Sequence, residues 1–165
     1  MRTLITGGKS ASALKLLKAF ANQHILLADY GDMPAFSSAA YQMHALGKRN
    51  DDTTAHTLLN NCLDENIEVL LPLHDFEIEA VAKSMVLFEE FGIKVLLPAP
   101  AELPKYLNTI KQSGDWALYQ DGVLQFPENA TEAQKELGLK ENLNGVFYTV
   151  DSPEGLIPVL FTINS

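Results

Sequence analysis

The chain has 165 residues, of which 47% are hydrophobic and 20% charged, so it can bury one sizeable core and is too apolar to be disordered. Its formal net charge of −9 disfavours nucleic acid as a partner, because phosphate backbones bind basic surfaces. No apolar run approaches the roughly 20 residues that span a bilayer, and the single cysteine, Cys62, cannot form an internal disulfide. We therefore expect a cytoplasmic protein with neither a membrane nor a nucleic-acid partner.

The first hundred residues alternate two hydrophobic periods. Apolar runs typical of buried strands cover 3–6, 24–29, 68–73 and 94–98, and a shorter run covers 43–46. Helical spacing lies between them, at 10–22, after Asp51 or Asp52, and at 76–91, with a short helix expected at 39–41. This order predicts an α/β fold, a Rossmann-like parallel sheet with right-handed crossovers and helices on both faces.

Each main helix has an expected apolar face and expected ends. Ser10 is the predicted N-cap of the first helix, Asp75 the N-cap of the third, and Gly92 the residue that ends it. Glu77 is expected among the charged residues off the apolar face of the third helix. The predicted inward residues are Leu14, Leu17 and Ala21, then Leu58, Leu59, Cys62 and Leu63, then Ile78, Val81, Ala82, Met85 and Phe88.

The pattern changes after Pro98. Helical segments are predicted just after Pro104, at 113–120 and at 131–139, the last capped by Thr131. A β-hairpin is predicted over 145–163, with Pro158 on an edge strand because it has no amide to donate. We therefore expect a Rossmann-like domain at 1–127 and a C-terminal helix and β-hairpin extension packed on it at 128–165. Because the hairpin is apolar on both faces, it also predicts a homodimer.

The turn after the first strand is one candidate ligand site. Gly7-Gly8 leads into a helix whose free amides suit an anion, and Lys9, Ser10 and Ser12 add a charge and hydroxyl groups. The run matches neither G-x-G-x-x-G nor G-x-x-x-x-G-K-[ST]. A tight strand-to-helix turn with a capping serine is the other interpretation.

Polar residues at two other strand ends complete the candidate site. Asp29 follows the glycine turn by about 20 residues, where an acid can bind a ribose hydroxyl or remain a solvated strand end. His74-Asp75 follows the third buried strand and is either a pH-active pair or a helix cap. The sequence has no nucleophile elbow, no paired catalytic carboxylates and no metal-ligand spacing, so we expect no catalytic residue, metal or cofactor. The predicted ligand-binding residues are Gly7, Gly8, Lys9, Ser10, Ser12, Asp29, His74 and Asp75.

The succession of segments at 4–14, 27–29, 36–39, 67–72, 92–98, 107–111 and 121–127 resembles one known domain. It is similar to the N-terminal pre-ATP-grasp domain, itself Rossmann-like, of carbamoyl-phosphate-synthase-like ATP-grasp ligases. Asn108 stands where that family usually has an aspartate, and Lys111 matches the lysine that follows. The 38 residues after Pro127 contain no counterpart of the ATP-grasp lobes, so the resemblance implies no catalysis by this chain alone.

Three functions are compatible with these features. The first is a stand-alone pre-ATP-grasp-like domain that binds a small ligand or a protein partner. The second is the substrate-binding piece of a split ligase, completed by a partner chain that carries the ATP-grasp lobes. The third is a nucleotide-binding enzyme or regulator that uses the Gly7-Gly8 turn.

Overall fold

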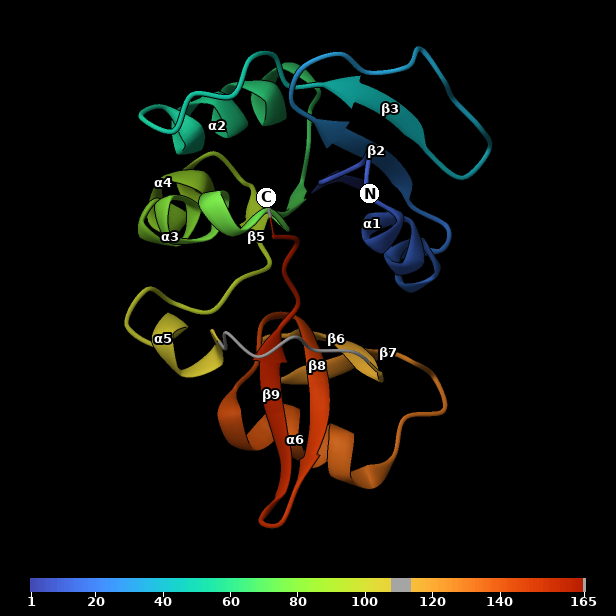
Figure 1. The fold of residues 1–165 in the computed structure, drawn as a ribbon, viewed down its shortest axis with the longest axis vertical. Coiled ribbons are helices and arrows are strands. Elements are labelled where there is room, and N and C mark those ends of the chain that lie inside the picture. Colours follow the sequence, from blue (N-terminus) through green and yellow to red (C-terminus); the bar gives the residue numbers. More distant parts are fainter. Residues whose placement is uncertain (108–113, 165) are drawn as a thin grey trace. The chain divides into compact units, whose positions relative to one another are not determined.

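The computed structural model describes residues 1–107 and 114–164, which form two compact units (Figure 1). The first unit contains Met1–Val95 together with the residues from Thr162 onward, and the second contains Leu96–Phe161. The first unit thus ends at Val95, earlier in the chain than the boundary expected after residue 127. Asn108 and Lys111 of the family resemblance lie outside the described residues. Within those residues, no helix has the length and apolarity to cross a membrane.

The first unit is built on a five-stranded parallel sheet, which confirms the α/β fold class. Its strands are β1 (Arg2–Thr6), β2 (His24–Asp29), β3 (Gln42–Ala45), β4 (Val69–Leu71) and β5 (Lys94–Val95), in the spatial order β3-β2-β1-β4-β5. The chain runs outward from β1 to β3 and then returns to β4 on the other side of β1. The carboxyl ends of β1 and β4 therefore flank the point where the strand order reverses, which is where open parallel sheets bind ligands.

Helices cover this sheet on both faces. They are α1 (Ala11–Lys15), the 3₁₀ helix η1 (Leu16–Phe20), α2 (Thr54–Asp64), α3 (Asp75–Lys83) and α4 (Met85–Glu90). The connection through α1 runs from β1 toward β2, whereas the connections through α2 and α3 run in the opposite direction across the sheet. Because each crossover is right-handed, α1 lies on one face and α2 and α3 lie on the other. Figure 1 shows the same grouping, with α2, α3 and α4 together and α1 apart from them.

The first helix differs from its prediction in length and in the face that it buries. α1 ends at Lys15 and tightens into η1, so three residues per turn replace 3.6 over the second half. This change of period turns Ala13, Leu16 and Phe20 inward and leaves Leu14 44% exposed. Leu14 and Ala21, which is also exposed, were thus wrongly predicted to face the core.

Several other helix boundaries also differ from expectation. α2 begins after Thr53 rather than at an Asp51 or Asp52 cap, and Leu63 at its end is exposed. The predicted helix at 76–91 is interrupted at Ser84 and divides into α3 and α4. Gly92 follows α4 with φ +76°, as expected of a residue that ends a helix. No helix forms at 39–41, where Ser37 makes an isolated antiparallel bridge to Gln42 instead.

The second unit contains an antiparallel sheet of four strands in the order β7-β6-β8-β9. Its elements are α5 (Leu103–Tyr106), β6 (Trp116–Gln120), β7 (Val123–Phe126), α6 (Glu132–Glu141), β8 (Gly145–Ser152) and β9 (Gly155–Leu160). The helix predicted at 113–120 is wrong over Trp116–Gln120, which is strand β6 paired with both β7 and β8. The β8–β9 hairpin, the Thr131 N-cap of α6 and the edge position of Pro158 are confirmed.

Candidate functional site

The carboxyl edge of the parallel sheet brings together the residues that the sequence singled out. The Gly7-Gly8 turn follows β1, Asp29 ends β2, and His74-Asp75 lies after β4, at the start of α3. Asp29 and His74 are 45 residues apart in the chain, yet Asp29 Oδ1 lies 2.9 Å from His74 Nε2. The other Asp29 oxygen, Oδ2, accepts a hydrogen bond of 3.1 Å from the Lys9 amide.

Asp29 and His74 form a buried ion pair. Their side chains are only 7% and 12% exposed. Burial by itself opposes both charges, but the hydrogen bond between the two side chains outweighs it, with help from other partners. The pKa of Asp29 is therefore lowered and the pKa of His74 is raised. Each shift favours the charged form.

Glu77 is a member of the site that the sequence analysis assigned to the solvent-exposed face of its helix. Its side chain is 0% exposed. Oε1 accepts hydrogen bonds from the Thr6 hydroxyl at 2.6 Å and from the His74 amide at 3.1 Å, and Oε2 accepts one from the Tyr30 hydroxyl at 2.6 Å. Burial raises the pKa of Glu77 although these hydrogen bonds oppose the rise. Burial, together with the charge of Glu77, also raises the pKa of Tyr30.

A sequence signal for the burial of Glu77 did exist. Glu77 lies four residues before Val81 and so shares the inward stripe of α3 with Val81 and Ala82. The usual preference of glutamate for solvent concealed this position. The N-cap of α3 is His74, and Asp75 is the first helical residue, so the predicted Asp75 cap is wrong. Asp75 is exposed, and its Oδ1 accepts a hydrogen bond from the Phe76 amide.

Three amides of the glycine turn donate hydrogen bonds within the protein. The Gly8 amide donates to the Ala28 carbonyl, the Ser10 amide to the Gly7 carbonyl, and the Lys9 amide to Asp29. A Cβ atom at Gly8 would lie 2.9 Å from the Leu27 carbonyl carbon, so close packing against β2 requires glycine. Ser10 caps α1 by accepting from the Ser12 amide. The local geometry is that of a tight strand-to-helix turn with a capping serine.

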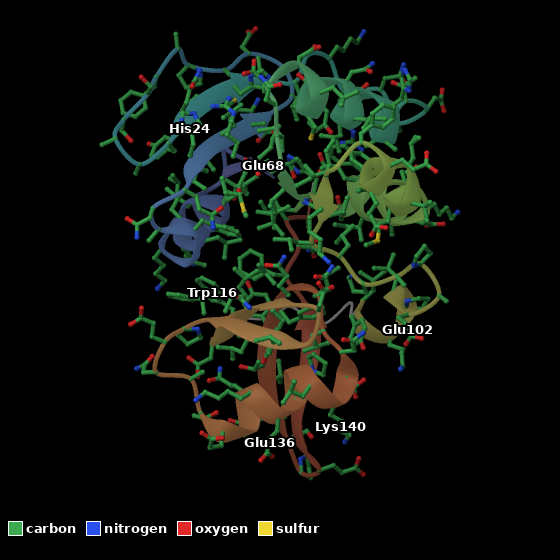
Figure 2. All side chains as sticks on the ribbon, turned by 180° about the vertical axis from the view of Figure 1, so that it is seen from behind. His24, Glu68, Glu102, Trp116, Glu136 and Lys140 are labelled. Carbon is green, nitrogen blue, oxygen red and sulfur yellow. The ribbon has the colours of Figure 1, made fainter. Side chains whose placement is uncertain are left out.

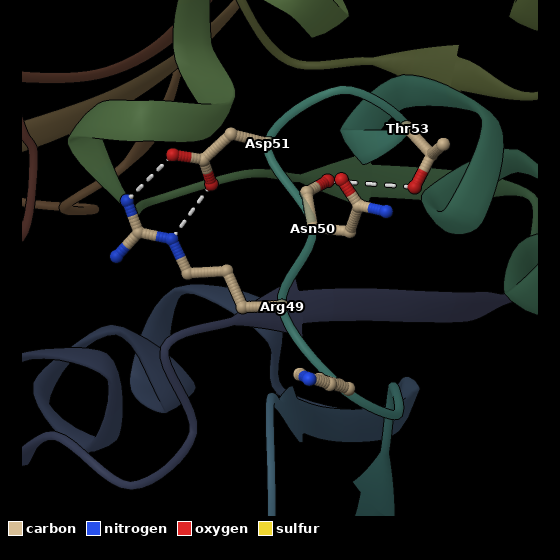
Figure 3. Close-up of a pocket in the computed structure, with 5 residues that line it drawn as sticks. Arg49, Asn50, Asp51 and Thr53 are labelled. Carbon is tan, nitrogen blue, oxygen red and sulfur yellow. Dashed lines mark hydrogen bonds and ion pairs between the residues drawn. The ribbon is translucent and has the colours of Figure 1, made fainter.

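An open hollow adjoins the ion pair, beyond the carboxyl ends of β2 and β3. Two cavities of about 680 and 560 Å³ share Lys48 and Arg49 in their lining. The first is also lined by Asn50, Asp51 and Thr53 (Figure 3), and the second by Tyr30, Gly31, Asp32 and Gly47. The sequence analysis missed this hollow because the sheet edge and the start of α2 meet there only in the folded chain.

A stack of planar groups connects the hollow to the ion pair. The guanidinium of Arg49 lies 3.6 Å above the centroid of the Phe76 ring and forms a two-pronged ion pair with Asp51, at 2.7 and 3.1 Å (Figure 3). The Phe76 ring in turn stacks on the His74 ring at a centroid distance of 5.0 Å. The Arg49 guanidinium and the Phe76 ring would thus separate a ligand that binds Arg49 from the Asp29–His74 pair.

The remaining candidates for chemistry lie elsewhere. His24 begins β2, at the edge of the sheet opposite Asp29 (Figure 2). Cys62 is buried, and burial raises the pKa of its thiol to about 12, which makes it an unreactive core residue. Across residues 1–107 and 114–164, no three His, Cys, Asp or Glu side chains are placed to hold one metal ion.

The comparisons with protein-family models and with curated proteins identify no relative. No protein-family model matches the chain, and no curated protein matches it either. The resemblance to pre-ATP-grasp domains therefore stays a prediction, and the function is inferred from the geometry of the site.

Proposed function

We propose that this chain is a pre-ATP-grasp-like domain, non-catalytic by itself, that binds a small anionic ligand at the carboxyl edge of its parallel sheet. The observation that carries the proposal is the hollow lined by Lys48 and Arg49 next to the buried Asp29–His74 pair. A concave site with a few convergent polar groups, beside residues of perturbed pKa, is the usual form of a ligand site.

The charges around the hollow favour an anion. Lys48 and Arg49 line both cavities, and Lys9 lies nearby, with its Nζ 2.6 Å from the Tyr30 carbonyl oxygen. Asp51, which pairs with Arg49, and Asp32 also line these cavities, so the proposal of an anion depends chiefly on Lys48. Carboxylate and phosphate groups accept hydrogen bonds from both kinds of cationic side chain. We therefore propose a small carboxylate or phosphate compound as the ligand.

The buried acids support binding rather than proton transfer. Both oxygens of Asp29 accept hydrogen bonds from the protein, Oδ1 from the Tyr30 amide and His74, and Oδ2 from the Lys9 amide. Both oxygens of Glu77 are engaged in the same way. Because the oxygens of Asp29 and Glu77 already accept hydrogen bonds from the protein, these acids hold their neighbours in position. Neither acid is available as a free base for proton transfer.

The alternatives differ in how much the geometry supports them. Nucleotide binding by the Gly7-Gly8 turn has less support, because the Gly8, Lys9 and Ser10 amides already donate within the protein. Completion by a partner chain with ATP-grasp lobes stays a prediction, and co-purification of such a chain would support it. A cytoplasmic location, expected from the single Cys62, also stays a prediction.

Substitution of Lys48 tests the proposal. In a thermal-shift screen with citrate, inorganic phosphate, ATP, NAD and amino acids, we expect at least one small anion to raise Tm. Saturation at 100 times Kd would add about 2.7 kcal/mol to the free energy of unfolding. Lys48→Gln removes one charged hydrogen-bond donor, so Kd measured by calorimetry should rise about tenfold.

Lys140→Gln is the matched control. Lys140 is an exposed lysine on α6 of the second unit (Figure 2), so the substitution changes the net charge equally but leaves the hollow intact. Kd should stay at the wild-type value in this variant. The proposal fails if no anion in the screen binds, or if Lys48→Gln and Lys140→Gln bind equally well.

A further inference from the structure

A short segment from the end of the chain lies at the point where the strand order reverses. We define Thr162–Asn164 as the closing segment; it follows the second unit in sequence but belongs to the first. Ile163 forms a parallel bridge with His74. Its amide donates to the Leu73 carbonyl at 2.7 Å, and its carbonyl accepts from the Asp75 amide at 2.9 Å. The closing segment therefore continues the sheet's hydrogen bonding beyond β4.

The side chain of Ile163 fills the space beside the glycine turn. A Cβ atom added to Gly7 would lie 2.5 Å from Ile163 Cδ1 and 3.8 Å from Leu73 Cβ. Real Cβ atoms do not approach other heavy atoms this closely, so Ile163 leaves no room at Gly7 for any further group. Gly7 also has φ +74°, a conformation that favours glycine.

We propose that the closing segment is an autoinhibitory contact, which must leave before a ligand can reach Gly7, the Leu73 carbonyl and the Asp75 amide. The crevice between the ends of β1 and β4 is the place where open parallel sheets receive their ligands. In this chain the Ile163 side chain and two main-chain hydrogen bonds occupy that crevice. The inference rests on the proposed function in one respect, since it takes this edge of the sheet as the edge that binds ligand.

The contact is small enough to open while the sheet stays folded. It consists of a half-buried side chain and the hydrogen bonds around one residue, whereas β1 is paired with β2 and β4 along its length. Segments with few buried contacts and few hydrogen bonds open locally at a lower free energy than the core. A ligand that binds only the open form shifts the population toward the open form. Its apparent affinity is reduced by the fraction of the protein that is open before the ligand binds.

Hydrogen exchange of the full chain tests whether the segment opens. Ile163→Ala removes the side chain beside Gly7 and keeps the backbone. We expect exchange of the Asp75 amide, which donates to the Ile163 carbonyl, to become at least tenfold faster, while the amides of β1 exchange as in wild type. Leu139→Ala, at an exposed residue of α6, is the matched control and should leave the Asp75 amide unchanged. Equal exchange of Asp75 in Ile163→Ala and wild type would overturn the inference.

Citrate binding followed by NMR tests access to the crevice. In Ile163→Ala, the Gly7 and Gly8 amide resonances should shift at a citrate concentration at least fivefold lower than in wild type. If citrate binds in a Lys48-dependent manner but these resonances do not move in Ile163→Ala, the autoinhibitory contact is refuted and the proposed function stands. If citrate binds neither protein, both proposals fail for this ligand class.

A double-mutant cycle gives a readout without ligand. Gly7→Ala adds a methyl group where Ile163 Cδ1 lies, at a residue with a positive φ. The drop in Tm that it causes should be at least twice as large in wild type as in the Ile163→Ala background, where only the backbone strain remains. Equal drops in the two backgrounds would show that Ile163 does not lie against Gly7.

Discussion

Asp29 and Glu77 are two buried carboxylates whose charges are compensated in different ways. Asp29 is paired with the imidazole of His74 at 2.9 Å and carries a lowered pKa. Glu77 accepts hydrogen bonds from two hydroxyl groups and one amide, and its pKa is raised because burial dominates. The network joins the ends of β1, β2 and β4, so each acid holds together segments that are distant in sequence.

Substitution of Glu77 should separate the roles of its shape and of its charge. Glu77→Ala leaves the Thr6 and Tyr30 hydroxyls and the His74 amide without their acceptor, and should lower the free energy of unfolding by about 3–5 kcal/mol. Glu77→Gln keeps an acceptor at the same place and should cost less than half as much. Chemical denaturation of the two variants measures this difference, and equal losses would show that the charge itself is required.

The Asp29–His74 pair should also make the stability of the fold depend on pH. The raised pKa of His74 means that its ionised form stabilises the fold fully below the unfolded value of about 6.5, and that this contribution is lost as pH rises through the folded pKa. The lowered pKa of Asp29 has the opposite sign, so its contribution is present above about pH 3.9 and is lost only in acid. Glu77 and Asp75 also face His74 and favour its charged form.

Wild-type Tm should therefore decrease as pH rises above about 6.5, and the decrease should be smaller in His74→Gln. Glutamine can still donate a hydrogen bond to Asp29 but does not titrate. His24→Gln is the control, since His24 is exposed at the opposite edge of the sheet. Parallel pH profiles for wild type and His74→Gln would contradict the assignment of this pH dependence to His74.

At the scale of elements, the sequence predicted best where local pattern and tertiary structure agree. Most residues of β1, β2 and β4 are buried, because both faces of these strands are covered. Thr131 marks the start of α6, and its hydroxyl accepts a hydrogen bond from the Gln134 amide. These sequence signals lie within a few residues of the strand or helix that they predict. Whether the element forms as predicted therefore does not depend on a partner that is distant in the sequence.

Elements stabilised by distant partners were predicted poorly. Trp116–Gln120 looks helical by itself but is strand β6, because it pairs with β8 about 28 residues later. The inward face of α1 was missed for a related reason, since the helix tightens into η1 where Leu16 and Phe20 enter the core. Tertiary packing overrides local preference in both elements.

The candidate site was predicted in part. The carboxyl edge, Asp29 and His74 follow from strand order alone, since parallel strands end at the same edge. Their direct contact, and the presence of Glu77 beneath it, depend on side-chain packing between β2 and α3 that no spacing rule specifies. Lys48 and Arg49 were not among the predicted site residues, because their place beside this edge and the contact of Arg49 with Phe76 exist only in the folded chain.

At the scale of the whole molecule, the chain leaves the first unit after Val95 and returns to it at Thr162. The second unit is therefore inserted within the first. Each unit has a sheet of its own, parallel in the first and antiparallel in the second. Removal of residues 144–165 would delete the central pairing partner of β6 and the closing segment together, so a truncation cannot report on self-association alone.

A homodimer through the β8–β9 hairpin stays a prediction, and the structure indicates which residue to substitute in order to test it. β9 is the edge strand of its sheet, but Pro158 has no amide to donate, so two hairpins cannot join through a continuous hydrogen-bonded ladder. An interface there must be formed by side chains, and Ile157, which is 43% exposed, is the large apolar side chain available on that strand. Burial of an exposed aliphatic residue between two copies is a common source of dimer stability.

Ile157→Lys should therefore dissociate the dimer by placing two like charges in an apolar contact. Light scattering should give the mass of two copies for wild type and of one copy for the variant at the same concentration. Val123→Lys is the matched control, because Val123 is 53% exposed on β7, the opposite edge of the same sheet, and its substitution adds the same charge. A wild-type mass of one copy at all concentrations would refute the dimer, and dissociation by Val123→Lys alone would move the interface to the β7 edge.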